Sequence, residues 1–463
     1  MPTLRLLLFC GFIIQVASGW AMASDSVRVN EISIQGNKVT KDFIILRELD
    51  FQVGTYLNTQ EINGRLQQNR NQIFNTRLFN VVQVSSMPVD SNGILVIIEL
   101  TEKWYIWPYP VIKFADRNFN IWWETKDLGR LNAGLNVYDY NFRGRAEKLK
   151  IRTLLGYTRL FMVDYEIPYL DRKKKKGLQL ELGYQSNKEI WLKPENNRLQ
   201  FLFDPNQRAI RFFSSDVSFL YRPQIFTRHR FTLGWEDILV SDTVLHSEQN
   251  PEFLAGRRNR QMSIKFFYTY KYDRRDIAYY PLKGHFIEIN AEPRYLVEDR
   301  SVYADIRFNA EKFFDMGAGF YAGIGLRGKV SFPEKQPYNL YQSLGYKFFV
   351  RGFEPYVIDG QHYGLIESNI KYCLFRRDID IPLIRMGQFK KAPTAIYLTA
   401  YTDGGYVHST RFQEPRNTYQ NTWLQGYGMG LDFVTYYDRV LRVEYSLNAF
   451  GRKGLYLHFT API

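Results

Sequence analysis

The chain has 463 residues, a formal net charge of +14 and a hydrophobic fraction of 45%, which together exclude an intrinsically disordered protein. After the first twenty residues, no run approaches the roughly 18 apolar residues of a membrane-spanning helix, and the mean hydropathy is −0.34. Helical membrane spans are therefore excluded from the rest of the chain. Yet 16% of the residues are aromatic, with 33 tyrosines and 35 phenylalanines, and so many rings require an explanation.

Residues 1–23 are predicted to be a secretory signal peptide. Arg5 supplies the positive start, Leu6–Val16 the apolar centre, and Ala21-Met22-Ala23 a small-x-small cleavage site. A membrane anchor is the alternative, but the apolar run is short for a span and the cleavage pattern follows it. The exported chain would keep Cys373 as its single cysteine, so no internal disulfide would stabilise it.

Residues 25–102 are predicted to form a small two-layer α/β domain. Alternating apolar runs indicate strands, and runs with helical periodicity lie between them. The expected order is β-α-α-β-β, with a strand at Val27–Ile34, a helix that Thr40 caps and that runs through Leu49, a second helix opened by Thr59, and strands at Phe79–Val84 and Ile94–Leu100. Such an order buries one hydrophobic core between a sheet and its helices.

Residues 103–463 consist of alternating segments about ten residues long, separated by turn residues. In the clearest segment, Met262–Tyr272, apolar and aromatic side chains share one face. The pattern fits either a soluble antiparallel sheet with one wet face or a transmembrane barrel with an apolar outside and a polar lumen. The barrel is favoured because the strands continue without covering helices, aromatic residues crowd their ends, and lipid admits only helices or closed barrels.

Sixteen candidate strands can be counted in this region, an even number as expected for a bacterial barrel. If the first strand runs outward from the periplasm, short turns such as Asn141–Arg145 and Asp171–Gly177 lie on the periplasmic side. Long loops such as Ser241–Arg258 and Pro333–Tyr363 then lie outside. Part of the positive charge is expected to line the lumen and the periplasmic turns. The predicted fold is mostly β: a 16-stranded antiparallel transmembrane β-barrel preceded by the α/β domain.

Several motifs resemble those of one known superfamily. In the barrel region they are Val350-Arg351-Gly352-Phe353, Tyr401-Thr402-Asp403-Gly404-Gly405, and a turn that contains Asp273, Asp276 and Gly284; in the N-terminal domain they are Ile34-Gln35-Gly36-Asn37, Gly54 and Leu78-Phe79. In this order they are similar to the outer-membrane protein assembly and transport superfamily, the BamA/TamA-like bacterial surface antigen family. The resemblance implies that residues 25–102 are a single polypeptide-transport-associated (POTRA) domain. It also implies that the loop carrying Arg351, loop six, folds back into the lumen.

Residue alternation suggests partners for Arg351. On the twelfth and thirteenth expected strands, Glu367 and Asp403 both fall on the parity that faces the lumen. An unpaired guanidinium in a confined site is costly, and its planar fork suits two carboxylates. We therefore expect Arg351 to bind Glu367 and Asp403, either as a pivot that keeps loop six docked or as a plain structural ion pair.

The C-terminus carries a second pattern. Arg452–Phe459 fits the barrel-assembly signal, with Gly454, Leu457 and Phe459 at the glycine, hydrophobic and aromatic positions. Four residues follow the aromatic position. The pattern indicates only that this barrel must itself be inserted into a membrane.

Enzymatic function is not indicated. The sequence has no Gly-x-Ser-x-Gly, His-Glu-x-x-His or P-loop motif, and six scattered histidines give no metal-ligand spacing. We therefore expect no catalytic residues, no metal and no cofactor. The basic run Arg172–Lys176 is expected to be a solvated periplasmic turn or a contact for anionic lipid heads or an acidic partner.

The resemblance implies a protein-inserting or protein-conducting function in the outer membrane, with the N-terminal domain in the periplasm. One hypothesis is that the protein assists assembly of outer-membrane proteins through a seam between its first and last strands that opens sideways. The alternatives are a secretion pore for a dedicated partner protein and a passive channel or structural barrel. The implied partners are unfolded outer-membrane or secreted client proteins, accessory lipoproteins and membrane lipid, without nucleic acid.

Overall fold

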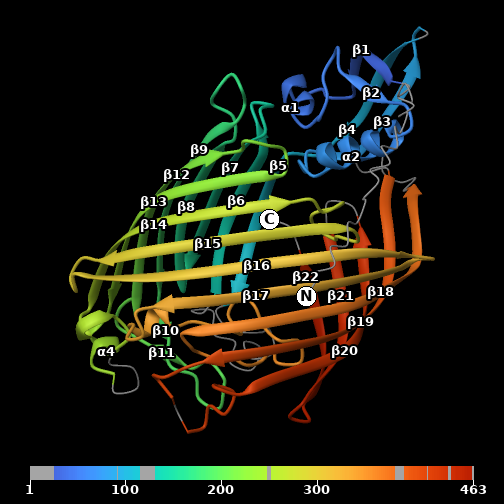
Figure 1. The fold of residues 1–463 in the computed structure, drawn as a ribbon. Coiled ribbons are helices and arrows are strands. Elements are labelled where there is room, and N and C mark those ends of the chain that lie inside the picture. Colours follow the sequence, from blue (N-terminus) through green and yellow to red (C-terminus); the bar gives the residue numbers. More distant parts are fainter. Residues whose placement is uncertain are drawn as a thin grey trace, which may run out of the picture.

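The computed structural model describes residues 26–90, 92–114, 131–247, 252–380, 391–413, 415–435 and 439–460. It consists of a small N-terminal α/β domain and a large barrel of strands, and the domain sits over one end of the barrel (Figure 1). The predicted signal peptide, residues 1–23, lies outside the described residues. No described helix has the length and apolar character needed to cross a membrane.

The N-terminal domain packs two helices against one four-stranded sheet. The sheet order is β2-β1-β4-β3, with β1 parallel to β4 and the other pairs antiparallel. In chain order the elements are β1 (Ser26–Gln35), α1 (Asp42–Leu46), β2 (Tyr56–Asn58), α2 (Ile62–Phe74), β3 (Phe79–Pro88) and β4 (Gly93–Glu102). Leu66 and Ile73 of α2 are buried with Val29 and Ile98 of the sheet in one core. The predicted two-layer architecture is confirmed.

Two local features differ from the predicted order of elements. The strand β2 lies between the helices and pairs only with Ser26–Arg28; its three residues are too few to show an alternating pattern. The helix α1 begins at Asp42, and Thr40 does not cap it. The Thr40 hydroxyl instead lies 2.9 Å from the Tyr105 hydroxyl and accepts a hydrogen bond from Asn141 Nδ2 at 2.8 Å. Thr40 therefore joins the N-terminal domain to the barrel.

The barrel is a sixteen-stranded antiparallel sheet in which each strand pairs with its neighbours in chain order, from β5 to β22. Its strands are β5 (Ile106–Phe114), β6 (Leu131–Phe142), β7 (Glu147–Gly156), β8 (Thr158–Ile167), β9 (Lys176–Asn187), β12 (Ile210–Tyr221), β13 (Thr227–Val240), β14 (Arg260–Asp273), β15 (Gly284–Leu296), β16 (Ser301–Gly317), β17 (Phe320–Phe332), β18 (His362–Asp380), β19 (Lys391–His408), β20 (Trp423–Thr435), β21 (Arg439–Asn448) and β22 (Lys453–Thr460). The predicted strand number is confirmed.

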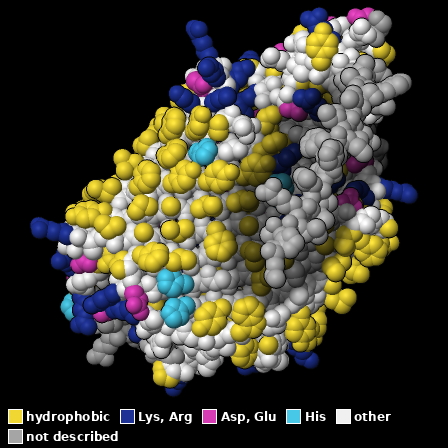
Figure 2. Space-filling model, in the orientation of Figure 1, with side chains coloured by type: hydrophobic (Ala, Val, Ile, Leu, Met, Phe, Trp, Pro, Cys, Tyr) yellow, Lys and Arg dark blue, Asp and Glu magenta, His cyan; other side chains and the backbone are white. Residues whose placement is uncertain are grey.

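The outer face of the barrel is apolar. On β14, Ile264 and Phe266 are exposed, whereas the neighbouring Ser263, on the opposite face of the same strand, is buried. The register places Ile264 beside Trp235 and Phe266 beside Leu233, so apolar side chains run across neighbouring strands. Figure 2 shows apolar side chains spread over the outer wall, with charges gathered near its ends. Lipid-facing rows on alternate residues explain how a chain rich in aromatic residues can have a low mean hydropathy.

The inner face of the barrel carries paired charges. Lys265 of β14 lies 3.0 Å from Glu236 of β13, and Arg327 of β17 lies 2.8 Å from Glu311 of β16. Such pairs satisfy charged side chains that the strand parity directs inward, where water is limited. The lumen is therefore polar, as the alternation predicted.

Loops close the end of the barrel that lies away from the N-terminal domain. They contain the hairpin of β10 (Glu189–Trp191) and β11 (Phe201–Phe203), the short helices α4 (Asp242–Leu245) and η2 (Ala255–Arg257), and η3 (Tyr338–Leu340) in loop six. Tyr338 is fully buried in the cluster they form. Its hydroxyl donates to Asp359 at 2.7 Å, and Tyr346 donates to the same carboxylate at 2.6 Å. Burial raises the pKa of Asp359 to about 6 despite these donors.

Candidate functional site

The tip of loop six, Val350–Phe353, packs against strands β19, β20 and β21 inside the barrel. Arg351 makes a two-pronged contact with Asp403 of β19: Nε lies 2.7 Å from Oδ2 and Nη2 lies 2.6 Å from Oδ1. The backbone N–H of Arg351 also donates to Oδ2 at 3.2 Å. The guanidinium lies over the Tyr401 ring, 3.8 Å from its centroid. Since the Arg351 side chain is 9% exposed and that of Asp403 is 0% exposed, this is a buried, charge-assisted contact.

The second carboxylate near Arg351 is Glu444 of β21, not Glu367. Arg351 Nη1 lies 3.5 Å from Glu444 Oε1. Glu367 does lie opposite Asp403 in the register of β18 and β19, and it lines the same cavity as Arg351, but its ion-pair partner is Arg327 of β17. The expectation that Arg351 binds Glu367 is therefore wrong. Parity placed Glu367 on the lumen face, but the position of Arg327 on the neighbouring strand decides its partner.

Two residues that sequence reasoning missed hold the backbone of the tip. Gly426 of β20 lies directly against the carbonyl of Arg351, and a Cβ at this position would overlap that oxygen. Asn448 of β21 donates from Nδ2 to the carbonyl of Gly352 at 2.7 Å. Gly352 itself has φ +90°, a conformation that L side chains rarely adopt. Strand parity could have identified Glu444, which shares a face of β21 with Arg442 and Ser446. Gly426 and Asn448 carry no comparable signal in the sequence.

The apolar residues of the tip are part of a core. Val350 and Phe353 are both 1% exposed and pack in a cluster with Leu344, Val407 and Leu424. The Phe353 ring meets Tyr419 edge-on at 5.3 Å and Phe450 at 6.0 Å between centroids. Aromatic pairs of this geometry add to the stabilisation from burial alone. All four motif residues of loop six are therefore fixed by the barrel wall or its loops.

The turn between β14 and β15 holds the paired aspartates in structural positions. Asp273 binds Arg275 through both oxygens, at 2.8 Å to Nε and 2.7 Å to Nη2. Asp276 Oδ1 accepts the backbone N–H groups of Leu282 and Lys283, at 3.1 and 3.2 Å. Gly284 has φ +108°, and a Cβ there would overlap the carbonyl of Arg274. The geometry of the turn therefore explains the spacing of the three motif residues.

The C-terminal pattern lies on the last strand. Leu457 and Phe459 of β22 are exposed on the outer face of the barrel, and Gly454 pairs with Ser446 of β21. Exposed apolar residues on a barrel strand are the ones that would face lipid.

Glu48, which follows α1, is the buried centre of the contact between the N-terminal domain and the barrel. Its carboxylate accepts hydrogen bonds from Nη1 and Nη2 of Arg222, both at 2.6 Å, and lies 3.2 Å from Arg47. Arg222 belongs to the turn between β12 and β13. Burial by itself would raise the pKa of Glu48, but the charge and hydrogen bonds of Arg222, followed by the charge of Arg47, bring it below its usual value.

Three further turns touch the domain around this ion pair. The backbone N–H of Lys41 donates to Gly144 at 2.9 Å, Arg47 Nε donates to the carbonyl of Lys174 at 2.6 Å, and Asn75 Nδ2 donates to the carbonyl of Asp276 at 3.1 Å. The Lys174 ammonium also lies over the Phe43 ring, 4.6 Å from its centroid. The basic turn that contains Lys174 thus contacts the chain's own N-terminal domain, a partner that the sequence did not predict.

Acidification is expected to release this contact. A carboxylate with a lowered pKa stabilises the folded contact fully above its unfolded pKa of about 4.3, and the stabilisation is lost as the pH falls through the lower folded pKa. Glu48→Gln removes the titrating group, so the docked fraction should be smaller at pH 7 and should change little down to about pH 3. Distances between spin labels on the exposed residues Gln52 and Lys173 would measure docking. An identical pH response in both proteins would contradict the assignment to Glu48.

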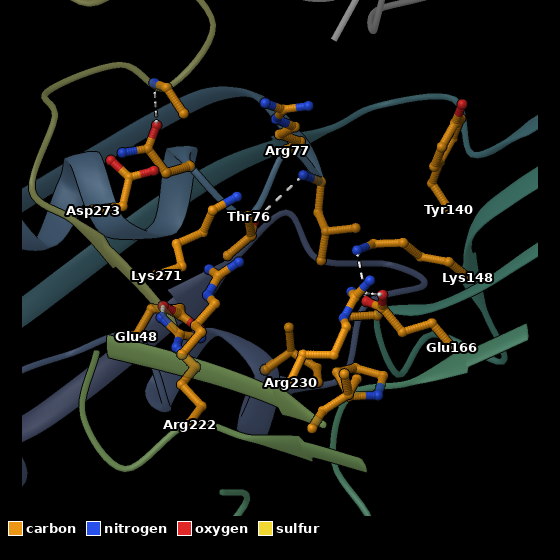
Figure 3. Close-up of a pocket in the computed structure, with 18 of the residues that line it drawn as sticks. Glu48, Thr76, Arg77, Tyr140, Lys148, Glu166, Arg222, Arg230, Lys271 and Asp273 are labelled. Atoms are coloured by element: carbon orange, nitrogen blue, oxygen red, sulfur yellow. Dashed lines mark hydrogen bonds and ion pairs between the residues drawn. The ribbon is translucent and has the colours of Figure 1, made fainter. Parts of the chain in front are cut away.

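A cavity of about 910 Å³ lies between the N-terminal domain and the inner wall of the barrel (Figure 3). Among the described residues, its wall carries eleven lysines and arginines against four carboxylates. The lysines and arginines are Arg77, Lys103, Lys148, Lys150, Lys175, Arg222, Arg228, Arg230, Lys271, Arg275 and Arg439. The carboxylates are engaged: Glu166, for example, lies 2.8 Å from Lys148 and 3.4 Å from Arg230. Part of the positive charge expected for the lumen and its turns thus lines this cavity.

The two ends of the sheet, β5 and β22, meet no partner beyond β6 and β21 within the described residues. Strand β5 carries Pro108 and Pro110, which pair in register with Val137 and Leu135 of β6. Because proline has no N–H, the hydrogen bonds to β6 come from the residues between them, and both prolines turn their nitrogens away from β6. The free edge of β5 therefore lacks two donors. A ladder to β22 would lose backbone hydrogen bonds worth about 0.5–1.5 kcal/mol each.

The sixteen-stranded barrel, the inward-folded loop six and the N-terminal α/β domain together define an outer-membrane barrel of the class that the motifs suggested. A family model described as the Omp85 superfamily domain matches residues 141–435, and the POTRA model, described as the surface antigen variable number repeat, matches residues 27–103. The first match covers more than half of the chain, so the protein belongs to the Omp85 superfamily. A comparison with curated proteins found no match.

Solved structures with a similar fold include BamA from Haemophilus ducreyi lacking POTRA domains 1–3 and CdiB from Escherichia coli. The first has a TM-score of 0.51 at 13% sequence identity, and covers 94% of this chain and 84% of its own. The second has a TM-score of 0.53 at 13% identity, and covers 94% of this chain and 75% of its own. At such identity these similarities concern the fold.

Proposed function

We propose that this protein assists the insertion and assembly of outer-membrane proteins, receiving clients at its POTRA domain and pairing their strands at a seam between β5 and β22 that opens sideways. The observation that carries the proposal is the free edge of β5, where Pro108 and Pro110 remove two donors. The barrel would span the outer membrane with the POTRA domain in the periplasm. No catalytic step is part of this proposal.

The energetic reason lies in the membrane. An unpaired backbone N–H or C=O in the hydrocarbon region costs several kcal/mol, so the edges of β5 and β22 must either pair with each other or accept another strand. A seam that lacks two donors on β5 costs less to open than the same seam with all its hydrogen bonds. A client strand can then add to the exposed edge by backbone hydrogen bonding that does not depend on its sequence.

The POTRA domain offers a second edge. On the side of β1 that faces β2, only Ser26–Arg28 are in register with that strand, and the described chain places no strand beside Ile32–Gln35. An extended client could pair there before it reaches the barrel. The cavity between the domain and the barrel wall, with its excess of positive charge, would attract acidic segments of the client.

Depletion of the protein from its host tests this proposal. We expect a general fall in the amounts of folded outer-membrane barrels, measured by quantitative proteomics of the outer-membrane fraction and by the heat-modifiable mobility of individual barrels. Loss of a single secreted protein with normal barrel levels would instead support a secretion pore. Altered solute permeability alone would support a passive channel. Crosslinking of periplasmic partners followed by purification would identify clients and accessory lipoproteins in the same cells.

A further inference from the structure

Three side chains that could bind a metal ion meet where loop six touches the end of the sheet. Glu354 follows the loop-six motif directly, Glu444 lies on β21, and His458 lies on the last strand, β22. One donor atom from each lies within 4.8 Å of the other two. His458 Nε2 is 3.3 Å from Glu444 Oε2 and 3.9 Å from Glu354 Oε1. None of these residues belongs to the motifs that define the family resemblance.

The facing atoms lack hydrogen bonds. Within the described chain, Glu354 Oε1, His458 Nε2 and both oxygens of Glu444 are buried and have no hydrogen-bond partner. The Glu444 side chain is only 1% exposed. A buried polar atom without a hydrogen-bond partner costs free energy. Two carboxylate oxygens and one imidazole nitrogen of this kind, directed at one point, suit a shared cationic partner.

The remaining atoms of the three residues are already held in place. Glu354 Oε2 accepts the N–H of Gly352 at 2.8 Å, which leaves Oε1 for the shared point. Glu444 Oε1 faces Arg351 at 3.5 Å, which leaves Oε2. The Phe349 ring stacks on His458 at 5.7 Å and fixes the imidazole plane. Contacts of this kind orient ligands in protein metal sites.

We propose that Glu354, Glu444 and His458 form a site for one divalent transition-metal ion of the zinc type. Zinc bonds of about 2.0–2.2 Å in a tetrahedron separate the donor atoms by roughly 3.3–3.6 Å. His458 Nε2 is at or near this separation from Glu444 Oε2 and Glu354 Oε1, at 3.3 and 3.9 Å, and rotation of the glutamate side chains can bring together their two oxygens, which lie within 4.8 Å of each other. One imidazole and two carboxylates suit such ions, whereas calcium and magnesium prefer oxygen ligands alone. Glu444 and His458 line a cavity of about 670 Å³, which provides an entry path and space for water as the fourth ligand.

The bound ion would join three separate elements. It would link the tip of loop six to β21 and to β22, the strand whose free edge forms one side of the seam. The site stands independently of the proposed assembly function, because its test is a binding measurement.

The test uses the full chain, purified without a histidine tag and stripped of metal with a chelator. Co²⁺ is the probe, because its visible absorption reports four-coordinate binding, and Zn²⁺ should displace it. We expect one equivalent of Co²⁺ per chain, and an affinity at least about a hundredfold lower in His458→Gln. His246→Gln, on the exposed end of α4, is the matched control and should bind like the wild type.

A second variant tests another of the three ligands. Glu354→Gln keeps a group that can accept the Gly352 N–H but removes the negative charge, and it should weaken Co²⁺ binding to a similar degree. Heat-modifiable mobility verifies that each variant is folded. Wild-type binding no tighter than about 1 mM, or equal binding in folded wild type, His458→Gln and Glu354→Gln, would overturn the proposal.

Discussion

Arg351→Ala is expected to undock loop six and to lower the free energy of unfolding of the barrel by about 3–5 kcal/mol. The substitution removes the guanidinium from Asp403, whose side chain is 0% exposed, and from Glu444, which is 1% exposed. Asp403 would remain in the interior without its cation, and Glu444 would keep Arg442, whose Nε lies 3.8 Å from Oε1. This loss of a partner is the costly way to break a buried ion pair. The barrel should fold poorly or lose its function in cells.

Urea unfolding followed by tryptophan fluorescence, together with protease cleavage within loop six, measures this effect. Arg416→Ala is the matched control, because Arg416 forms an ion pair with Glu195 in which both side chains are more than half exposed. Such a surface pair contributes about 0–1 kcal/mol. Arg351→Lys should fall between the two, because it keeps the charge but loses the planar fork. Equal stability and equal cleavage of Arg351→Ala and Arg416→Ala would contradict a docking role for Arg351.

Gly426→Ala is expected to displace the same loop by crowding its backbone. Its new methyl group would overlap the carbonyl oxygen of Arg351, a backbone atom that cannot rotate away. Crowding of this kind costs about 1–3 kcal/mol, and relief requires the loop tip or β20 to move. We expect faster protease cleavage within loop six while the barrel stays assembled.

Gly364→Ala provides the control, because a Cβ at that position on β18 meets no atom within 4 Å. The double variant Arg351→Ala/Gly426→Ala adds a second check. If both substitutions break one contact, their effects on loop-six cleavage should not add. Additive effects, or a Gly426→Ala protein that is cleaved like Gly364→Ala, would show that Gly426 does not seat the loop.

The sequence predicted the architecture well because its main signals are periodic. Alternation along the strands is set by the pleat, so strand number, lumen parity and the position of loop six could be read from it. Inward parity included Asp403 among the expected partners of Arg351, and the structure shows this pair. The strand β2 was not predicted because its three residues are too few to show an alternating pattern.

Contacts between distant elements could not be predicted in the same way. Parity places Glu367 and Glu444 equally on the lumen face, and only the three-dimensional position of Arg327 directs the first away from Arg351. The pair of Glu48 and Arg222 joins residues 174 positions apart in two separate domains. Neither residue has a local pattern that reports the other.

The opening of the seam can be measured most directly with a reversible lock. In a Cys373→Ser background, cysteines at Ile106 of β5 and Leu457 of β22, both exposed on the outer face, would be joined by oxidation or by a short bismaleimide. The control pair, Val443 and Leu457, are register partners within the β21–β22 ladder, so their crosslink leaves the seam free. Folding of a client barrel is followed in proteoliposomes before and after reduction. We predict that the oxidised seam lock stops client folding, that reduction restores it, and that the control crosslink has no effect. Client folding at the unlocked rate through a fully crosslinked seam would contradict lateral opening.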